Sequence, residues 1–406
     1  MARRRLLLLF GFLSFWEPNG AFGPTVSFPS GAAGKTTSLL EMQGQESIDT
    51  LATVSNPWYS DPSIGRDRTD VLDHRDADWK AIVSQDARFV LQTANGMYYT
   101  EQEATSLSAA PQPVFWTYPQ LVQLLGEEQV LKDSLHSDNA QQFLAWLGEH
   151  NDHNYWICYV EKPSFSHDQA LQVWEKNRDN HPKLDSSLQM TGLREFGDRL
   201  DSSVDSAILA TANGIVEFHT SHPFCAKCGS STRIRKAGAS RQCANCGTSV
   251  YPRIDVASIM LITTRCQQYA LLGRKQNWPP GRYSTLAGFA EVGETLEQCC
   301  ARETHEESGV TVERSSIRFV CSQPWPFPRS LMVGFRAQAK DAGRPDIAID
   351  KLEMEDVQWF HKDYVRERLS GGSTALSFTP NEKEQEFHIP GRASLARILI
   401  SQWANE

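Results

Sequence analysis

Residues Gly288 to Val310 read GFAEVGETLEQCCARETHEESGV, and this stretch decides the fold of the C-terminal part of the 406-residue chain. The four residues from Thr295 to Gln298 have the form of a capping box, which predicts a helix that begins at Thr295. Gly309 is placed to end this helix, because a glycine just past the last turn adopts the left-handed conformation without strain. The stretch therefore predicts a loop, one helix and a sharp stop.

Three glutamates share one face of the predicted helix. At about 100° per residue, Glu303, Glu306 and Glu307 fall within roughly a quarter of a turn, on a stripe that is otherwise apolar. An acidic run on a helix is usually a solvated face. Here the glutamates continue an apolar stripe, where a carboxylate is costly unless it binds a metal ion or meets a cation. Clustered carboxylates suit Mg²⁺ or Mn²⁺, which take oxygen ligands and bridge to phosphate groups.

The spacing of this stretch resembles the signature of Nudix hydrolases, which cleave the phosphate–phosphate bond of nucleoside diphosphates linked to another group. Its fixed positions are Gly288, Glu294, Arg302, Glu303, Glu306, Glu307, Gly309 and Val310. The resemblance implies that Glu303, Glu306 and Glu307 bind the catalytic Mg²⁺ or Mn²⁺, and that Glu307 is the general base. It also places Arg302 in the catalytic site, where its guanidinium suits a forked ion pair with a helix carboxylate.

A second stretch, Ser322 to Ser330, reads SQPWPFPRS. Three prolines stiffen it, and two aromatic rings offer flat faces to a nicotinamide or adenine ring. It resembles the array that follows the signature in NADH pyrophosphatases, and the alternative is a proline-rich loop packed on the domain. The resemblance implies that the substrate is contacted by Phe289, Gln323, Trp325, Phe327, Ser330 and Ala396.

An acidic segment from Asp350 to Asp356 follows further along the chain. It resembles the segment that supplies a distal acidic metal ligand in this family, and Glu353 aligns with that ligand best. Glu355 and Asp356 stand close enough in sequence to remain alternatives.

Four cysteines form two pairs separated by fourteen residues: Cys225 with Cys228, and Cys243 with Cys246. This is the spacing of a four-thiolate zinc site, with disulfides or redox CxxC pairs as the alternative. The zinc is expected to be structural, because four thiolates leave no open coordination position. NADH pyrophosphatases carry a ribbon of this kind directly before the Nudix domain, although a zinc ribbon also suits an RNA-binding protein.

The chain is long enough for two domains with additional segments, and its net charge of −9 argues against a general nucleic-acid-binding surface. The expected fold class is α/β: a Nudix α/β/α sandwich with a mixed sheet, preceded by a zinc ribbon and an N-terminal α+β domain. The predicted divisions are a targeting presequence (1–60), a linker (61–87), an N-terminal domain (88–217), the ribbon (218–252) and the catalytic domain (253–406). Strands are predicted over 87–91, 155–160, 257–264, 269–273, 317–321 and 331–339, and helices over 207–219 and 393–403.

The first 60 residues differ in composition from the rest. Three arginines precede an apolar run from Leu6 to Trp16, which is too short to span a bilayer and fits a signal-peptide core. Residues 18–40 then contain no acid and are rich in hydroxyl side chains, as in a transit peptide. The combination resembles the bipartite presequence of algae with secondary plastids, so we expect a plastid protein that is not membrane-bound once mature. A mitochondrial presequence and a secretory signal are the alternatives.

Together these features predict a divalent-metal-dependent pyrophosphatase that splits NADH or NAD⁺ into AMP and a nicotinamide mononucleotide. NAD-capped RNA is a further candidate substrate, because the cap is NAD joined through its adenosine. The first alternative is a Nudix hydrolase of another dinucleotide or ADP-sugar, such as FAD or ADP-ribose. The second is a zinc-ribbon RNA-binding protein. The resemblance also implies a homodimer.

Overall fold

The computed structural model describes residues 59–66, 84–102, 110–126, 134, 140–177, 186–370 and 387–406. Apart from Tyr59 and Ser60, the predicted presequence lies outside these residues. Of the segment 61–87 that the sequence predicts as a linker, residues 61–66 and 84–87 are described. Residues 61–66 pack on the N-terminal domain, because Gly65 exchanges two backbone hydrogen bonds with Glu149.

The N-terminal domain is built on a mixed sheet with strand order β3-β2-β1-β6-β5, in which β4 also pairs with β1 and β7 with β2. The pairing of β1 with β6 is parallel and the other pairings are antiparallel. The strands are β1 (Ala87–Thr93), β2 (Gly96–Gln102), β3 (Gln112–Pro113), β4 (Phe115–Trp116), β5 (Gln142–His150), β6 (His153–Val160) and β7 (Ser186–Thr191).

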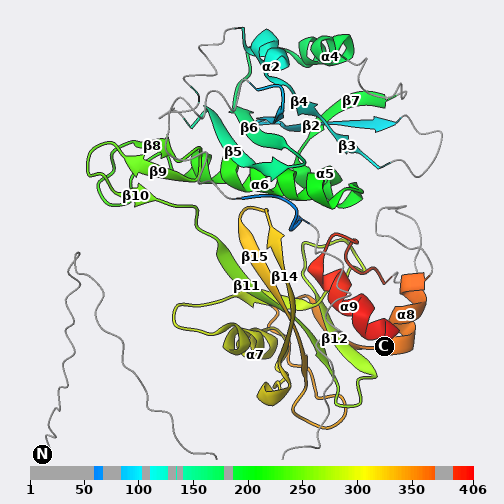
Figure 1. The fold of residues 1–406 in the computed structure, drawn as a ribbon. Helices are drawn as coiled ribbons and strands as arrows, with labels where there is room; N and C mark the ends of the chain where they lie inside the picture. Colours follow the sequence, from blue (N-terminus) through cyan, green and yellow to red (C-terminus); the bar gives the residue numbers. More distant parts are fainter. Residues whose placement is uncertain are drawn as a thin grey trace, which may run out of the picture. The chain divides into compact units, whose positions relative to one another are not determined.

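Helices cover both faces of this sheet, as Figure 1 shows. The helices are α2 (Tyr118–Leu125), α4 (His167–Lys176), α5 (Leu193–Phe196), the 3₁₀ helix η3 (Gly197–Arg199) and α6 (Ser203–Ser221). Side chains alternate along β1, so that Phe89 and Leu91 pack in the core under α2 and α4, whereas Val90 packs in the core under α6. The N-terminal α+β domain that the sequence predicts is confirmed.

A small three-stranded sheet follows α6, in the order β10-β9-β8. Its strands are β8 (Thr232–Arg235), β9 (Ser240–Cys243) and β10 (Ser249–Val250). It is held to the end of α6 through a buried arginine, because Arg241 donates hydrogen bonds to Thr232 and to the ring of His219.

The catalytic domain is a second mixed sheet, with strand order β14-β15-β11-β12-β16 and with β13 paired to β11. Its strands are β11 (Asp255–Thr263), β12 (Tyr269–Arg274), β13 (Leu286–Phe289), β14 (Arg318–Trp325), β15 (Ser330–Gln338) and β16 (Asp356–His361). Its helices are α7 (Leu296–Ser308), the 3₁₀ helix η4 (Arg314–Ser316), α8 (Lys362–Ser370) and α9 (Leu395–Asn405). One core packs α7 against the sheet and another packs α8 and α9 against the opposite face, which confirms the predicted α/β/α sandwich (Figure 1).

Strand β14 extends beyond residue 321, where the sequence predicts its end, as far as Trp325. Pro324 lies within this strand and pairs with Leu331. A proline cannot donate to a strand ladder, but β14 is the edge strand of the sheet, where one side of the strand needs no partner. Residues Ser322 to Trp325, the first four of SQPWPFPRS, are therefore part of the sheet rather than of a loop.

Within the described part of the chain, no helix is both long enough and apolar enough to cross a membrane.

Candidate active site

The local signals around α7 act as the sequence predicts. Thr295 is the N-cap: its Oγ1 accepts a hydrogen bond from the Gln298 N–H (3.2 Å), and the Gln298 Oε1 accepts one from the Thr295 N–H (2.9 Å). Gly309 follows the last turn with φ of 72°, and its N–H donates to the His305 carbonyl (2.7 Å). The capping box and the glycine thus set where the helix that carries the three glutamates begins and ends.

Two of the three glutamates of α7 are buried. Glu303 is 8% exposed and Glu307 is 1% exposed, whereas Glu306 is exposed. Burial raises the pKa of Glu307 to about 7. The positive charge of Lys275 acts to lower this pKa, and the negative charge of Glu303 acts to raise it. Lys275 Nζ lies 3.5 Å from one carboxylate oxygen of Glu307, and the Ala287 N–H donates to the other (3.3 Å). A carboxyl group with a pKa near neutrality is suited to accept a proton during catalysis.

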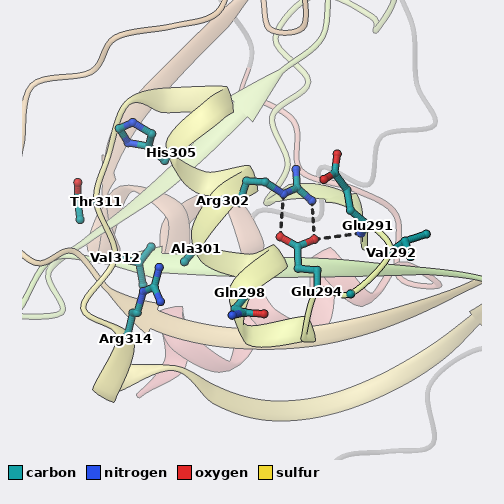
Figure 2. Close-up of a pocket in the computed structure, with 11 residues that line it drawn as sticks. Glu291, Val292, Glu294, Gln298, Ala301, Arg302, His305, Thr311, Val312 and Arg314 are labelled. Carbon is teal, nitrogen blue, oxygen red and sulfur yellow. Dashed lines mark hydrogen bonds and ion pairs between the residues drawn. The ribbon is translucent and has the colours of Figure 1, made fainter. Parts of the chain in front are cut away.

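Arg302 holds three carboxylates at once. Its Nε and Nη2 donate to the two oxygens of Glu294 at 2.8 and 2.9 Å, which is the forked pair drawn in Figure 2. Its Nη1 donates to Glu303 and to Glu306, both at 2.8 Å. Nη2 also donates to the carbonyl of Phe289 (2.9 Å), so the guanidinium joins the loop, the helix and the end of β13. The sequence predicts a forked pair with a helix carboxylate, whereas the fork holds Glu294 of the loop, and the helix carboxylates of Glu303 and Glu306 each accept a single hydrogen bond.

The backbone of β13 approaches the carboxyl group of Glu303 so closely that any larger residue at Gly288 would displace one of them. A Cβ atom on Gly288 would lie 1.8–2.2 Å from the three carboxyl atoms of Glu303, which is inside contact distance. Two buried carboxylates and one exposed carboxylate offer the oxygen ligands that Mg²⁺ and Mn²⁺ prefer, so the donor set suits a divalent ion. The ligand atoms of Glu303, Glu306 and Glu307 do not all lie within 4.8 Å of one another in this structure. In this structure cationic side chains, Arg302 and Lys275, neutralise the same oxygens.

Figure 2 shows a pocket beside the N-terminal part of α7 and Arg302. Its volume is about 580 Å³, and its lining residues include Glu294, Arg302 and Arg314 but neither buried glutamate.

Among the alternatives for the distal acidic ligand, the surroundings favour Glu353. Its negative charge contributes to the raised pKa of Glu303, after burial and against the charge of Arg302, so the two carboxylates lie near each other. Glu355 forms an ion pair with Arg274, and Asp356 accepts a hydrogen bond from Tyr283.

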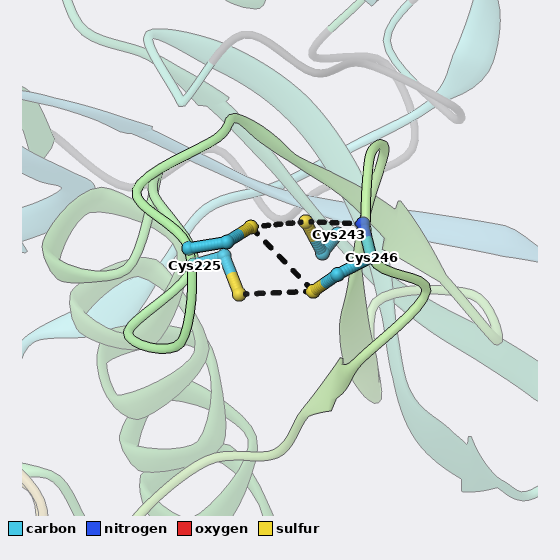
Figure 3. A group of neighbouring side chains, drawn as sticks. Cys225, Cys243 and Cys246 are labelled. Carbon is cyan, nitrogen blue, oxygen red and sulfur yellow. Dashed lines mark hydrogen bonds between the residues drawn. The ribbon is translucent and has the colours of Figure 1, made fainter.

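The four cysteines meet around one point, as Figure 3 shows. The Sγ atoms lie 3.4 Å apart for Cys228 and Cys243, 3.5 Å for Cys228 and Cys246, and 3.7 Å for Cys225 and Cys246. Zinc–sulfur bonds of about 2.3 Å in a tetrahedron require sulfurs about 3.8 Å apart, so the quartet fits a zinc ion with little adjustment. In the described residues, no other group of three or more such side chains places its ligand atoms within 4.8 Å of one another.

Comparison with known proteins agrees with these two sites. Residues 220–251 match the NADH pyrophosphatase zinc ribbon domain, and residues 252–380 match the NUDIX domain. Over 236 residues the chain is 36% identical to a protein of Mycobacterium bovis named NAD-capped RNA hydrolase NudC, covering 57% of this chain and 71% of that protein. The chain is a Nudix hydrolase of the NADH pyrophosphatase family.

Two further proteins are similar to parts of this chain. The human protein named NAD-capped RNA hydrolase NUDT12 is 34% identical over 246 residues, which are 58% of this chain and 48% of that protein. A solved NUDIX hydrolase from Nitrosomonas europaea is 25% identical and covers 41% of this chain and 97% of its own, with a TM-score of 0.30.

In this Nudix hydrolase, sheet register brings two of the predicted substrate residues into one row. Phe289 pairs with Ala257, Ala257 with Met332, and Met332 with Gln323, so the row crosses β13, β11, β15 and β14. Phe289 is 57% exposed and its ring is free to stack on a base. Gln323 is fully buried: its Nε2 donates to the Ala393 carbonyl (2.8 Å) and its Oε1 accepts from the Leu395 N–H (2.9 Å). The side chain of Gln323 therefore fixes the start of α9 to β14.

The remaining predicted substrate residues lie in packed surroundings. Trp325 and Phe327 are partly buried against the core of the N-terminal domain. Ser330 is buried at the start of β15, and Ala396 is buried between α9 and the sheet. Substrate contact by these residues stays a prediction.

Two residues at the site were not predicted from the sequence. Lys275 lies directly after β12 and meets Glu307, and Tyr59 meets Trp325 and Phe327. Neither residue belongs to a motif, and each is far from its partners along the chain, so no local pattern marks them.

Proposed function

We propose that the chain hydrolyses the pyrophosphate bond of NADH and NAD⁺, giving AMP and the reduced or oxidised nicotinamide mononucleotide. The observation that carries this proposal is the buried pair Glu303 and Glu307 on α7, with Glu303 against the backbone of Gly288, one residue from the exposed ring of Phe289. The pair supplies the acidic site that a pyrophosphate-bound divalent ion needs, and the ring supplies a stacking surface beside it. The zinc ribbon and SQPWPFPRS favour NADH pyrophosphatases among the Nudix hydrolases.

In the proposed reaction, water attacks one phosphorus atom and the bond from that phosphorus to the bridging oxygen breaks. Glu307 takes a proton from the attacking water, and the bridging oxygen leaves on the other phosphate, so that each product carries a phosphomonoester. Arg302 keeps Glu303 and Glu306 in place during this step. Divalent ions, when bound, offset the charge of the pyrophosphate and make the water more acidic. We propose Glu303, Glu306, Glu307 and Glu353 as their ligands, with either Mg²⁺ or Mn²⁺.

NAD-capped RNA is the second substrate that we propose. The relatives from Mycobacterium bovis and human carry the name of NAD-capped RNA hydrolase. The bond to be cleaved is the same as in NAD⁺, and the RNA extends from the adenosine ribose. An RNA-binding role without hydrolysis is disfavoured, since the carboxylate set is complete and the net charge is −9.

A panel of substrates tests this function. The full-length chain is incubated with Mn²⁺ or Mg²⁺ and with NADH, NAD⁺, ADP-ribose, FAD or NAD-capped RNA, and products are separated by chromatography. We expect the highest kcat/KM on a nicotinamide substrate, with AMP among the products. Equal rates over the panel would reduce the proposal to a general Nudix hydrolase. Absence of turnover on every substrate, together with salt-sensitive RNA binding by the Glu307→Gln variant, would favour the RNA-binding alternative.

We also propose a homodimer. Three large apolar side chains near the ends of the ribbon segment, Phe224, Tyr251 and Ile254, are about 60% exposed or more, as is common at protein interaction surfaces. Gel filtration with light scattering at monomer mass would contradict this proposal.

For location we propose a plastid, on the composition of residues 1–60 alone. A fluorescent protein fused behind these residues should enter the plastid of an algal cell with secondary plastids; arrival in mitochondria or the medium would contradict this.

A further inference from the structure

Tyr59 lies at the start of the described chain, outside every motif, and is 4% exposed. Its ring makes edge-to-face contacts with two aromatic rings of the SQPWPFPRS stretch, those of Trp325 and Phe327. The centroid distances are 6.2 Å to Trp325 and 5.8 Å to Phe327, at interplanar angles of 77° and 82°. Trp325 and Phe327 meet each other in the same way, at 5.2 Å and 80°. The three rings therefore form one edge-to-face cluster, an arrangement that fixes the orientation of each ring.

The segment that carries Tyr59 is anchored firmly on the N-terminal domain. The Tyr59 N–H donates to Ser206 Oγ (3.1 Å) on α6, and Asp61 accepts a hydrogen bond from Ser203 Oγ (2.5 Å) on the same helix. Gly65 pairs with Glu149 on β5 through hydrogen bonds of 2.8 and 2.9 Å. The position of Tyr59 is thus set by its own segment and by the N-terminal domain, and not by Trp325 and Phe327.

The segment that carries the two rings is also contacted from α5 and α6. The Asn213 side chain on α6 donates to the carbonyl of Pro326 (2.6 Å), the residue between Trp325 and Phe327. The guanidinium of Arg194 on α5 lies 5.6 Å from the centre of the Phe327 ring. Residues of the N-terminal domain therefore contact the turn between β14 and β15 through a hydrogen bond and a cation–π interaction.

The sheet joins this turn to the row of paired residues that runs from Phe289 through Ala257 and Met332 to Gln323. Trp325 pairs with Ser330 and Ser330 with Asp255, two residues along each strand from the row that ends at Phe289. Two residues of a strand span about 7 Å, so a change in the turn is transmitted to the row over a short distance.

We propose that Tyr59 is a positioning residue for the substrate-recognition segment, residues 323–330. It acts through Trp325 and Phe327, whose orientation it sets, and it does not touch the carboxylates that carry the chemistry. The inference rests on the proposed function, because it needs residues 323–330 to contact the substrate. It follows that a presequence removed from the active enzyme ends before Tyr59, and is therefore shorter than the predicted 1–60.

The test measures NADH hydrolysis by the full-length chain and by Tyr59→Leu, Tyr59→Met and Tyr59→Phe. We expect KM to rise roughly tenfold in the Leu and Met variants while kcat stays within about twofold, since affinity and not the catalytic carboxylates is disturbed. The Phe variant keeps the ring and should keep the wild-type KM. The use of two aliphatic replacements covers the case in which one of them fails to fold.

The matched control is Tyr99→Leu. Tyr99 is buried in the same core and stacks on Phe196 at 4.5 Å, but it makes no ring contact with Trp325 or Phe327. It should lower the thermal unfolding midpoint without changing KM. A general loss of stability in the N-terminal domain is thereby separated from positioning.

A double-mutant cycle with Phe327→Leu tests the route of the effect. If Tyr59 acts through Phe327, the increase in KM caused by Tyr59→Leu is largely lost in the Phe327→Leu background. An unchanged KM in both aliphatic variants, an equal rise in Tyr99→Leu, or full additivity in the cycle would each overturn the inference. Failure of the wild-type chain to hydrolyse NADH would instead overturn the proposed function.

Discussion

Lys275 Nζ lies 3.5 Å from Oε1 of Glu307, so the proposed general base has a cation beside it before any metal binds. The lysine side chain is 41% exposed, whereas that of Glu307 is 1% exposed. Burial raises the pKa of Glu307 to about 7 and the charge of Lys275 opposes this rise. In the metal-free chain, burial and the negative charge of Glu303 favour the protonated form of Glu307, and Lys275 favours the charged form.

We predict that Lys275→Met moves the acid limb of the pH profile of kcat/KM to higher pH. Hydrolysis needs deprotonated Glu307, so kcat/KM falls as the pH falls through the pKa of Glu307. Without the lysine charge this pKa rises further, and the acid limb of the profile moves to higher pH. The measurement is kcat/KM for NADH over about pH 5 to 9 at saturating Mn²⁺, and Lys275→Arg serves as the charge-preserving control. A limb that stays in place or moves to lower pH would contradict this prediction.

Gly288→Ala should abolish most of the activity. The added Cβ would lie about 2 Å from the Glu303 carboxyl group, so either the carboxylate or β13 must move. A displacement of about 1 Å at a catalytic group costs roughly 10²-fold in rate, and we expect a loss of kcat/KM of that order together with weaker Mn²⁺ binding. Gly192→Ala is the control, because Gly192 has φ of −66° and its added Cβ has no atom within 4 Å. Similar losses in both variants would show that crowding of Glu303 is not the cause.

One zinc ion per chain should be found by elemental analysis. Four Sγ atoms at tetrahedral spacing form a closed site, and zinc held in such a site contributes directly to folding. Cys243→Ser should lose the zinc and lower the thermal unfolding midpoint, whereas Cys266→Ser, which changes an exposed cysteine outside the quartet, should retain it. Full zinc content in Cys243→Ser would rule out this quartet as the site.

His219 should make the folded state sensitive to mild acid. Its Nδ1 accepts from Arg241 (3.2 Å) and its Nε2 donates to the Gly238 carbonyl (3.0 Å), so a second ring proton would point at a guanidinium. Burial and then the charge of Arg241 lower the pKa of His219 to about 3, against about 6.5 in an unfolded chain. The stabilisation is fully present above about pH 6.5 and is lost as the pH falls, at up to about 1.4 kcal/mol per pH unit.

Urea unfolding at about pH 7 and pH 5 measures this loss of free energy of unfolding. The His219→Gln variant is less stable at neutral pH but should lose less stability between the two pH values. Zinc release at low pH affects both proteins, so the difference between them isolates the histidine. Equal losses in both proteins would contradict the assignment.

The parts of the site that the sequence predicts correctly depend on neighbouring residues. The bounds of α7 follow from Thr295 and Gly309, which act within one turn of their own positions. The zinc quartet follows from two short CxxC spacings. The end of β14 was predicted too early, because Pro324 is tolerated only on an edge strand and the sequence does not show which strand is at the edge.

The parts that the sequence does not predict depend on partners far along the chain. Lys275 meets Glu307 only because β12 ends beside α7, and Tyr59 meets Phe327 only because two domains touch. Gln323 lies in a motif that resembles a substrate site, yet its hydrogen bonds go to Ala393 and Leu395. A motif therefore indicates which residues matter, but the tertiary packing decides what each side chain contacts.

The role of Glu307 is tested by comparing NADH hydrolysis by the wild-type chain and by Glu307→Gln at saturating Mn²⁺. The glutamine keeps the shape of the side chain and removes its capacity to accept a proton. We predict AMP and reduced nicotinamide mononucleotide from the wild type, and a rate at least roughly 10²-fold lower from the variant, since a general base contributes on that order. Equal rates from the two proteins would contradict the assignment of Glu307 as the catalytic base.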